Sequence, residues 1–370
     1  MRGVRLADVV ASRENNFDVL RLGAAMVVLL EHCIPLTAAA VPALGGLYEA
    51  VLIQGVTVFF AISGFLIARS WVSATRARTY AAKRALRLIP GLVVAVVFTS
   101  FVIGPLFTSL SLGAYLSDPA PYVYVLRCAL LITFAGTLPG VFTDNPFPDA
   151  VNGVLWTLPV EACAYLIVGM LGVAGLLVRR WILPLAFACA LVLGSPLVDL
   201  DSLLTIGDGN TGDAALVSNL IATFLAGSLL FVHHERVTLS WWLAVPVAIL
   251  WWVVAGSPWD ETVAALVIPY LVLMGAYRTP ASWRRLTRPG DVSYGVYVYA
   301  FPIQQSVVAL WSGVRPLTLF AIAAPLAYAA GLASWRLIER PALDLKRRLP
   351  GGGPVEGRSS ARDSTPDPSS

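Results

Sequence analysis

The feature that most limits the fold of this chain is a series of apolar segments separated by short polar stretches. Eleven segments can be counted, beginning near Phe17, Leu47, Leu88, Tyr122, Val151, Trp181, Ala214, Leu239, Val263, Val292 and Pro316. About 20 helical residues cross a bilayer, and helices satisfy their own backbone hydrogen bonds in lipid. Only 13% of the 370 residues are charged, against about 25% in soluble domains. We therefore expect an all-α polytopic membrane protein.

Positive charges order the crossings, because loops rich in Lys and Arg stay on the cytoplasmic side. The N-terminal stretch carries Arg2, Arg5 and Arg13 and is expected inside. Two crossings later comes the strongest basic cluster, which comprises Arg69, Arg76, Arg78, Lys83, Arg84 and Arg87. The later loops obey the rule only if residues 122–140 do not cross. We predict about ten transmembrane helices plus one re-entrant or interfacial segment, with both termini cytoplasmic, in the plasma (inner) membrane.

The chain is expected to hold one domain. The segment 122–140 contains Arg127 and has prolines within it and beside it, which is typical of an interrupted span. Residues 349–370 are rich in Gly, Pro and Ser and lack apolar periodicity. We predict a membrane domain over residues 1–348, followed by a disordered tail at 349–370.

A single histidine, His32, lies well inside the first apolar segment. An ionisable residue within a span is costly and indicates function by default. Arg21 precedes it by eleven residues, which returns to nearly the same helix face at a distance of about 16 Å. This spacing predicts a reaction site at His32 that is supplied from the membrane face at which Arg21 lies. The alternative is a histidine that bridges two helices by hydrogen bonds.

The partner that the predicted topology favours for His32 is Glu161, because both residues fall in the outer half of their spans. A carboxylate bonded to an imidazole fixes its tautomer and stabilises the imidazolium, as a general base requires. Glu31 is the rival, but it points about 100° away from His32 on the helix, so we expect it not to be the partner. Glu161 could instead be a packing carboxylate bonded to Thr157 or Tyr165.

The basic run that contains Lys83, Arg84 and Arg87 is the candidate donor-binding site. Arg84 and Arg87 are three residues apart and share a helix face. Two guanidinium groups on one face suit the binding of phosphates, and Arg21 is expected at the same membrane face. Ordinary positive-inside anchoring is the alternative. Tyr294 and Tyr297, one turn apart, form either a cavity wall or part of an aromatic belt.

Several segments together resemble the acyltransferase family 3, the integral membrane O-acyltransferases. They occur in family order over residues 17–345. The matching residues are Phe17, Asp18, Arg21 and His32; Ser63, Gly64 and Phe65; Lys83, Arg84, Arg87 and Pro90; Asn152, Trp156, Thr157 and Glu161; Asp291, Ser293, Tyr294 and Tyr297; and Trp335, Glu339 and Pro341. One departure is Tyr299-Ala300-Phe301-Pro302, where many members have a histidine.

The resemblance implies acyl transfer from cytoplasmic acyl-CoA, usually acetyl-CoA, to a hydroxyl of a glycan, glycolipid or glycosylated small molecule. It implies that His32 is catalytic with Arg21 as its partner, that Arg84 and Arg87 bind the donor, and that Trp156 and Glu161 match the tryptophan and the acid of the family. With the residue patterns added, we predict that Glu161 is also catalytic, that Lys83 helps to bind the donor, and that Asn152, Trp156, Tyr294 and Tyr297 bind substrate. We expect no metal and no nucleic-acid partner. A proton-coupled transporter or flippase is the alternative function, and a structural membrane scaffold is a third.

Overall fold

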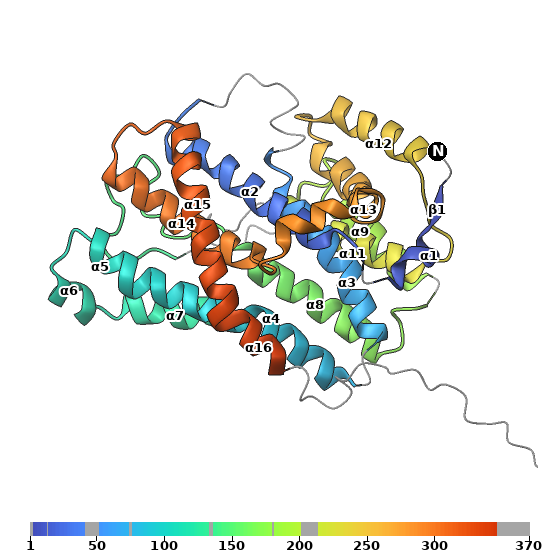
Figure 1. The fold of residues 1–370 in the computed structure, drawn as a ribbon, viewed down its shortest axis with the longest axis horizontal. Helices are drawn as coiled ribbons and strands as arrows, with labels where there is room; N and C mark the ends of the chain where they lie inside the picture. The colour runs from blue at the N-terminus through green and yellow to red at the C-terminus, as the bar shows by residue number, and fades with distance from the viewer. Residues whose placement is uncertain are drawn as a thin grey trace, which may run out of the picture.

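The computed structural model describes residues 3–12, 14–40, 52–73, 76–132, 136–179, 181–200 and 214–345, and most of these residues are helical (Figure 1). In chain order the elements are β1 (Val4–Arg5), α1 (Leu6–Val10), α2 (Phe17–Leu36), α3 (Gly55–Val72), α4 (Ala77–Phe98), η2 (Thr99–Ile103), α5 (Gly104–Phe107), α6 (Leu112–Ser117), α7 (Ala120–Ala129), α8 (Thr157–Val173), α9 (Ile182–Leu193), α11 (Ala214–Val232), β2 (Thr238–Leu239), α12 (Trp241–Val254), α13 (Asp260–Arg278), η3 (Ala281–Thr287), α14 (Ser293–Leu310), α15 (Pro316–Ser334), η4 (Trp335–Glu339) and α16 (Arg340–Asp344). The predicted tail at 349–370 lies outside the described residues.

Six helical stretches within the described residues are long and apolar enough to cross a membrane. They are Phe17–Leu36, Gly55–Val72, Ala77–Phe107, Ala214–Val232, Asp260–Arg278 and Pro316–Asp344. Three shorter apolar helices are Thr157–Val173, Ile182–Leu193 and Trp241–Val254. The helical membrane fold expected from the sequence is therefore confirmed, whereas the number of about ten crossings stays a prediction.

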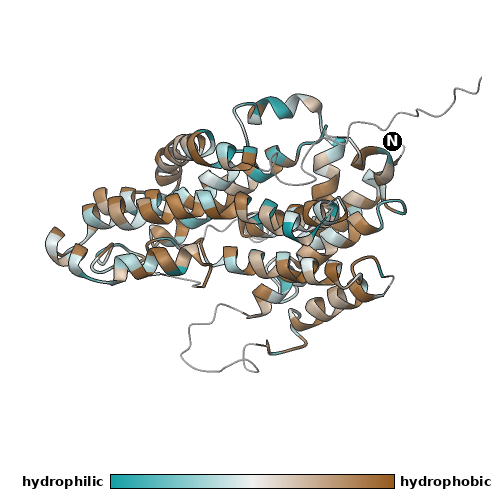
Figure 2. Cartoon of the chain, turned by 90° about the horizontal axis from the view of Figure 1, so that it is seen from below, coloured by the Kyte–Doolittle hydropathy of each residue, from teal (hydrophilic) through white to brown (hydrophobic). Residues whose placement is uncertain are grey.

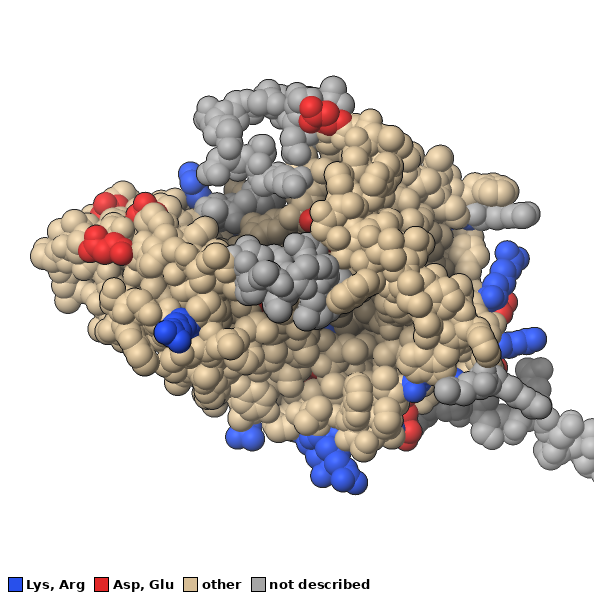
Figure 3. All heavy atoms as spheres, turned by 90° about the horizontal axis from the view of Figure 1, so that it is seen from above, with Lys and Arg blue, Asp and Glu red and all other residues tan. Residues whose placement is uncertain are grey.

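The outer surface of the bundle is apolar, as lipid contact requires. Leu166, Met170 and Val173 on α8 and Trp242 and Val253 on α12 all have large exposed side chains. Figure 2 shows hydrophobic residues along most of the helices. Figure 3 shows a mostly uncharged face, with Lys, Arg, Asp and Glu near its margins. An apolar surface of this extent favours a lipid environment over water.

The centre of the bundle depends on a close approach of α3 and α11. A Cβ atom on Gly64 would lie 1.9 Å from the backbone oxygen of Phe224, and one on Gly227 would lie 2.4 Å from that of Ala61. The Ser228 hydroxyl donates to the Gly64 carbonyl at 3.0 Å. Small residues at helix interfaces allow such contact in membrane proteins, and here they fix the position of α3 beside the site.

The predicted re-entrant segment leaves and returns to the same end of α4. The chain passes through α5 and α6 and enters α7, whose ten residues span about 15 Å, half of a bilayer core. After residues 133–135, which are not described, the chain returns: the Ser109 amide donates to the Gly140 carbonyl at 2.9 Å, and the Thr108 hydroxyl donates to the Pro139 carbonyl at 2.7 Å. This path agrees with a segment that does not cross.

The bundle has two ends, which we call the basic end and the far end. The basic end is where α2, α4 and α14 begin and where Arg21, Arg84 and Arg87 lie around one cavity. The far end is where Leu310 ends α14 and where the chain passes from Phe107 into the re-entrant segment. Since α2 and α14 both run from the basic end to the far end, residues along these helices report depth within the bundle.

Candidate active site

A cavity of about 400 Å³ lies at the basic end, between α2, α3, α4, α8 and the start of α14. We call it the basic cavity. Its lining includes six residues that the sequence analysis selected, which are Arg21, Arg84, Arg87, Glu161, Tyr294 and Tyr297. The structure therefore brings six of the ten selected residues to one cavity, and the other four lie elsewhere.

Asp291 organises the charges of the basic cavity. Its Oδ2 accepts a hydrogen bond from Arg87 at 2.6 Å and another from Arg21 at 3.3 Å, while Oδ1 accepts from the Ser293 hydroxyl at 2.6 Å. Burial alone would raise the pKa of Asp291. The Arg87 and Arg21 guanidinium groups and the Ser293 hydrogen bond outweigh this effect and lower the pKa to about 2. The carboxylate therefore stays ionised and holds the two arginines together.

The two arginines of the basic run have different surroundings. Arg87 is engaged by Asp291, lies 3.8 Å from the Glu339 carboxylate and sits over the Tyr294 ring at 5.9 Å. Arg84 also lines the cavity, but its buried Nε has no hydrogen-bond partner among the described residues. Lys83 is not part of the lining. Arg84 is thus the cation of this run that is left available for a ligand.

Glu161 lies in the basic cavity and is held by hydroxyl groups. Its Oε1 accepts hydrogen bonds from the Ser63 hydroxyl at 2.8 Å and from the Tyr165 hydroxyl. The Tyr80 hydroxyl in turn donates to the Tyr165 carbonyl at 2.8 Å, which places this turn of α8 beside the start of α4. Glu161 therefore faces the space where a ligand of the basic cavity would lie.

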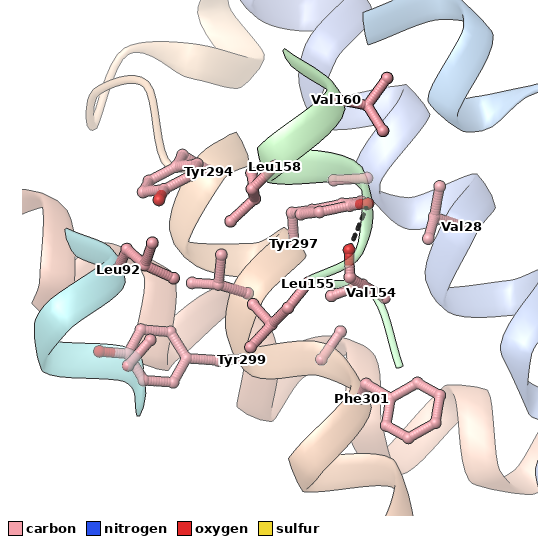
Figure 4. Close-up of a cluster of buried hydrophobic side chains, with 14 of the residues drawn as sticks. Val28, Leu92, Val154, Leu155, Leu158, Val160, Tyr294, Tyr297, Tyr299 and Phe301 are labelled. Carbon is pink, nitrogen blue, oxygen red and sulfur yellow. Dashed lines mark hydrogen bonds between the residues drawn. The ribbon is translucent and has the colours of Figure 1, made fainter. Parts of the chain in front are cut away.

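Tyr297 and Thr157 lie at the end of the basic cavity that is nearest the middle of the bundle. Their hydroxyl oxygens are 2.7 Å apart, and the Tyr297 hydroxyl also donates to the Val154 carbonyl at 3.1 Å (Figure 4). Figure 4 shows Phe301 one turn further along α14, toward the far end. The lining of the cavity does not include His32.

His32 is paired with Glu31, not with Glu161. Its Nδ1 lies 2.8 Å from the Glu31 carboxylate and 2.8 Å from the Val28 carbonyl. Both oxygens can only accept, so Nδ1 carries the proton and Nε2 of the neutral ring is left with its lone pair. The ring packs edge-on against Phe301 at 5.4 Å. This is the arrangement of a general base with an orienting carboxylate.

The predicted pairing of His32 with Glu161 is wrong because the two residues lie at different depths. Thr157 is level with Tyr297, and Glu161 lies four residues further along α8, about 6 Å toward the basic end. Phe301, which contacts His32, lies about 6 Å from Tyr297 toward the far end. The separation along the bundle is therefore about 12 Å. The expectation that Glu31 would not be the partner is also wrong, since its carboxylate lies 2.8 Å from the ring although the two residues are adjacent in the sequence.

The other selected residues serve the packing of the bundle. Asn152 donates from Nδ2 to the Val298 carbonyl at 2.9 Å and so ties the start of α8 to α14. Trp156 is partly buried against the apolar core. Neither residue lines the basic cavity, so the structure does not bring Asn152, Trp156 or Lys83 to a ligand there.

The sequence analysis gave no functional role to several residues that shape the site, namely Glu31, Asp18, Ser63, Tyr165 and Asp291. The signal for Asp291 was present, because it is an acidic residue two positions before Ser293 in a chain whose basic residues gather at that membrane face. The signal for Glu31 was its position next to the only histidine within an apolar segment. Ser63 belongs to the segments that resemble the family, and Tyr165 was named as an alternative partner of Glu161, which their hydrogen bond confirms.

Comparison with known proteins gives a consistent result. The model of the family described as "Acyltransferase domain" matches residues 14–336. Nodulation protein 10 of Rhizobium leguminosarum bv. viciae is 30% identical, over 92% of this chain and 96% of its own length. An O-acetyl transferase of Shigella phage Sf6 is 29% identical, over 89% of this chain and 96% of its own length. No solved structure matches. The family resemblance noted in the sequence is confirmed, and the chain belongs to the acyltransferase family 3.

Proposed function

We propose that this chain is a membrane O-acyltransferase that moves an acyl group, acetyl in the first instance, from cytoplasmic acyl-CoA to a hydroxyl of an extracytoplasmic or membrane-associated glycan, glycolipid or glycosylated small molecule. Membership of the family and the likeness to an O-acetyl transferase support the reaction class. The observation that carries the proposal is the position of the Glu31–His32 pair, which lies further along α2 and α14 than the residues of these helices that line the basic cavity.

The donor is proposed to bind with its phosphates at the basic end. Arg84 offers a guanidinium without a partner among the described residues, and Arg21 lies across the same cavity. Guanidinium groups bind phosphate oxygens through paired charge-assisted hydrogen bonds. From Arg21 to His32 the rise along α2 is about 16 Å, a length that suits a thin arm with a reactive thioester at its tip.

The chemistry is proposed to take place at His32. Nε2 removes the proton from the acceptor hydroxyl as its oxygen attacks the thioester carbonyl. The carbon–sulfur bond then breaks, and the imidazolium returns the proton to the departing CoA thiolate. The Glu31 carboxylate, 2.8 Å from Nδ1, stabilises the imidazolium between these two steps. Atoms and charge balance without any further reactant.

The proposal requires an opening between the basic cavity and His32. Tyr297 and Thr157 end the cavity one helical turn short of the His32 ring. The acyl end of the donor must pass these two side chains, so the Tyr297 hydroxyl has to leave its hydrogen bonds to Thr157 and Val154 during the reaction.

Purified protein with labelled acetyl-CoA tests the proposal. The wild type is expected to bind the donor and to transfer label to an envelope extract from a strain that lacks the gene. His32→Ala is expected to bind the donor but to transfer no label. Arg84→Ala is expected to bind it about tenfold to 100-fold more weakly, because a hydrogen bond to a charged group contributes about 1.5–3 kcal/mol.

Lys83→Ala is the matched control, since Lys83 is adjacent to Arg84 but is not part of the cavity lining. It removes the same charge and is expected to leave donor affinity unchanged. Folded wild-type protein that binds no acetyl-CoA would contradict the proposal and favour the transporter alternative. Undiminished transfer by His32→Ala would remove His32 from the mechanism.

A further inference from the structure

A second cavity, of about 510 Å³, lies at the far end of the bundle, and we call it the far cavity. Three stretches of chain surround it: the end of α5 with Thr108 and Ser109, the chain from Gly140 to Pro146, and the end of α14 with Ala309 and Ser312. In Figure 1, α5 and the end of α14 lie at the same side of the molecule. None of the functional residues selected above lines this cavity.

The lining of the far cavity has the chemistry that binds polyhydroxylated ligands. The Asp144 carboxylate and the Thr143 and Ser312 hydroxyls are exposed and make no hydrogen bond within the described part of the chain. Phe107 is partly exposed and packs against Phe142 at 5.2 Å, so an apolar ring lies beside these polar groups. Hydroxyls donate and accept, and a carboxylate accepts strongly, which matches the hydroxyl groups and apolar faces of a sugar.

The wall of the far cavity is fixed by buried hydrogen bonds. Asn145 donates from Nδ2 to Gln305 Oε1 at 2.7 Å. Gln305, fully buried on α14, donates from Nε2 to the carbonyls of Phe147 at 2.8 Å and Ala150 at 2.7 Å. The chain that carries Asp144 is therefore held to α14 before any ligand arrives, which lowers the entropic cost of binding.

The far cavity adjoins the His32 side of the bundle. Phe301, Gln305 and Val308 follow one face of α14 at spacings of four and three residues, and Ser312 lies in the turn just after the helix. Phe301 contacts the His32 ring, whereas Val308 and Ser312 line the far cavity. From Phe301 to Val308 the rise is about 10 Å. The far cavity and the basic cavity thus approach His32 from opposite directions.

We propose that the far cavity holds the carbohydrate part of the acceptor, with Asp144 accepting hydrogen bonds from sugar hydroxyls. The inference rests on the proposed function and extends it, because it assigns a binding site and a ligand class to the acceptor. A sugar in this cavity directs a neighbouring hydroxyl toward His32, while the donor reaches His32 from the basic end.

The test fills the cavity without touching the catalytic residues. Ala309→Trp places an indole in the far cavity, and Leu310→Trp places the same indole at the next position of α14, which is 79% exposed and is not part of the lining. Labelled acetyl-CoA is the donor, and the envelope extract described above is the acceptor at varied concentration. Ala309→Trp is expected to raise the acceptor concentration for half-maximal transfer by tenfold or more, with the acetyl-CoA dependence unchanged. Leu310→Trp is expected to match the wild type.

A second pair of variants keeps the test decisive if Ala309→Trp no longer binds acetyl-CoA. Asp144→Asn is expected to raise the half-maximal acceptor concentration about tenfold, and Asp149→Asn, on the same stretch of chain but outside the cavity lining, is expected to change it little. Wild-type acceptor dependence in both Ala309→Trp and Asp144→Asn would overturn the assignment. Label recovered on lipids that lack sugar would also overturn it. A wild-type protein that transfers no acetyl group would refute the proposed function itself, and this inference with it.

Discussion

Glu31→Gln is the substitution that separates the site seen in the structure from the one expected from the sequence. Glutamine keeps an oxygen that can accept the hydrogen bond from His32 Nδ1, and Val28 continues to accept from the same atom. The tautomer of the ring is therefore preserved. What is lost is the negative charge beside the imidazolium, so the variant measures the electrostatic contribution of Glu31 to catalysis.

The size of that contribution follows from the contact. At the 2.8 Å separation, opposite unit charges attract by about 6 kcal/mol at an effective dielectric constant of about 20 and by about 1.5 kcal/mol in bulk water. The Glu31 and His32 side chains are 22% and 23% exposed, which places the value between these limits. A loss of about 3 kcal/mol in the transition state corresponds to a rate about 100-fold lower.

The assay is turnover of labelled acetyl-CoA at saturating donor and acceptor, with donor affinity measured in parallel. Glu31→Gln is expected to lower kcat about 100-fold and to leave donor affinity unchanged. Glu161→Gln is the matched control: because Glu161 lies in the basic cavity, the variant is expected to change donor affinity more than kcat. A kcat for Glu31→Gln within threefold of the wild type, or a larger loss of kcat in Glu161→Gln, would refute the assignment.

Two further predictions concern stability, measured as thermal unfolding in one detergent. Asp291→Ala leaves Arg87 and Arg21 without their shared carboxylate and is expected to cost about 3–5 kcal/mol; an unchanged midpoint would contradict the assigned ion pairs. Because the pKa of Asp291 is lowered to about 2, its contribution is present above its ordinary pKa and is lost only as the pH falls through about 2, so the difference from the wild type should be constant between about pH 8 and about pH 5. Gly64→Ala drives a Cβ atom into the Phe224 backbone and is expected to cost about 1–3 kcal/mol or more. Gly23→Ala, where nothing lies within 4 Å of the added atom, is expected to gain up to about 1 kcal/mol, and equal effects of the two glycine variants would contradict the packing of α3 on α11.

The sequence predicted the helical membrane fold because its signals are local. A run of apolar residues indicates a span wherever it occurs, and basic residues indicate the membrane face. The same charge argument singled out residues 122–140, and the hydrogen bonds between Ser109 and Gly140 and between Thr108 and Pro139 agree with it. Helix bounds and the interrupted helices at η2 and η4 depend on tertiary packing and were not accessible from periodicity.

The candidate site was predictable in part for a related reason. Arg21, Arg84 and Arg87 were predicted at one depth because basic residues gather at one membrane face, and in the fold Asp291 binds both Arg21 and Arg87. The partner of His32 was not predictable in this way. Depth inferred from loop charges has an error of a helical turn or more. Glu161 lies one turn of α8 on one side of the Thr157–Tyr297 contact, and Phe301, which contacts His32, lies one turn of α14 on the other side. These two turns are enough to separate Glu161 from His32. The contact between the adjacent side chains of Glu31 and His32 cannot be read from helical spacing at all.

The contrast between Arg84 and Arg87 shows why a pair of like residues in a motif need not share one role. From spacing alone the two guanidinium groups are equivalent, since they lie on the same helix face. In the fold, Asp291 neutralises Arg87 at 2.6 Å, whereas the Nε of Arg84 is buried without a partner among the described residues. Replacing Arg87 therefore leaves a buried carboxylate partly uncompensated and disturbs the junction of α4 with α14, while replacing Arg84 removes a charge that only a ligand would use. A variant that changes both arginines mixes these effects, so donor binding has to be read from Arg84 alone.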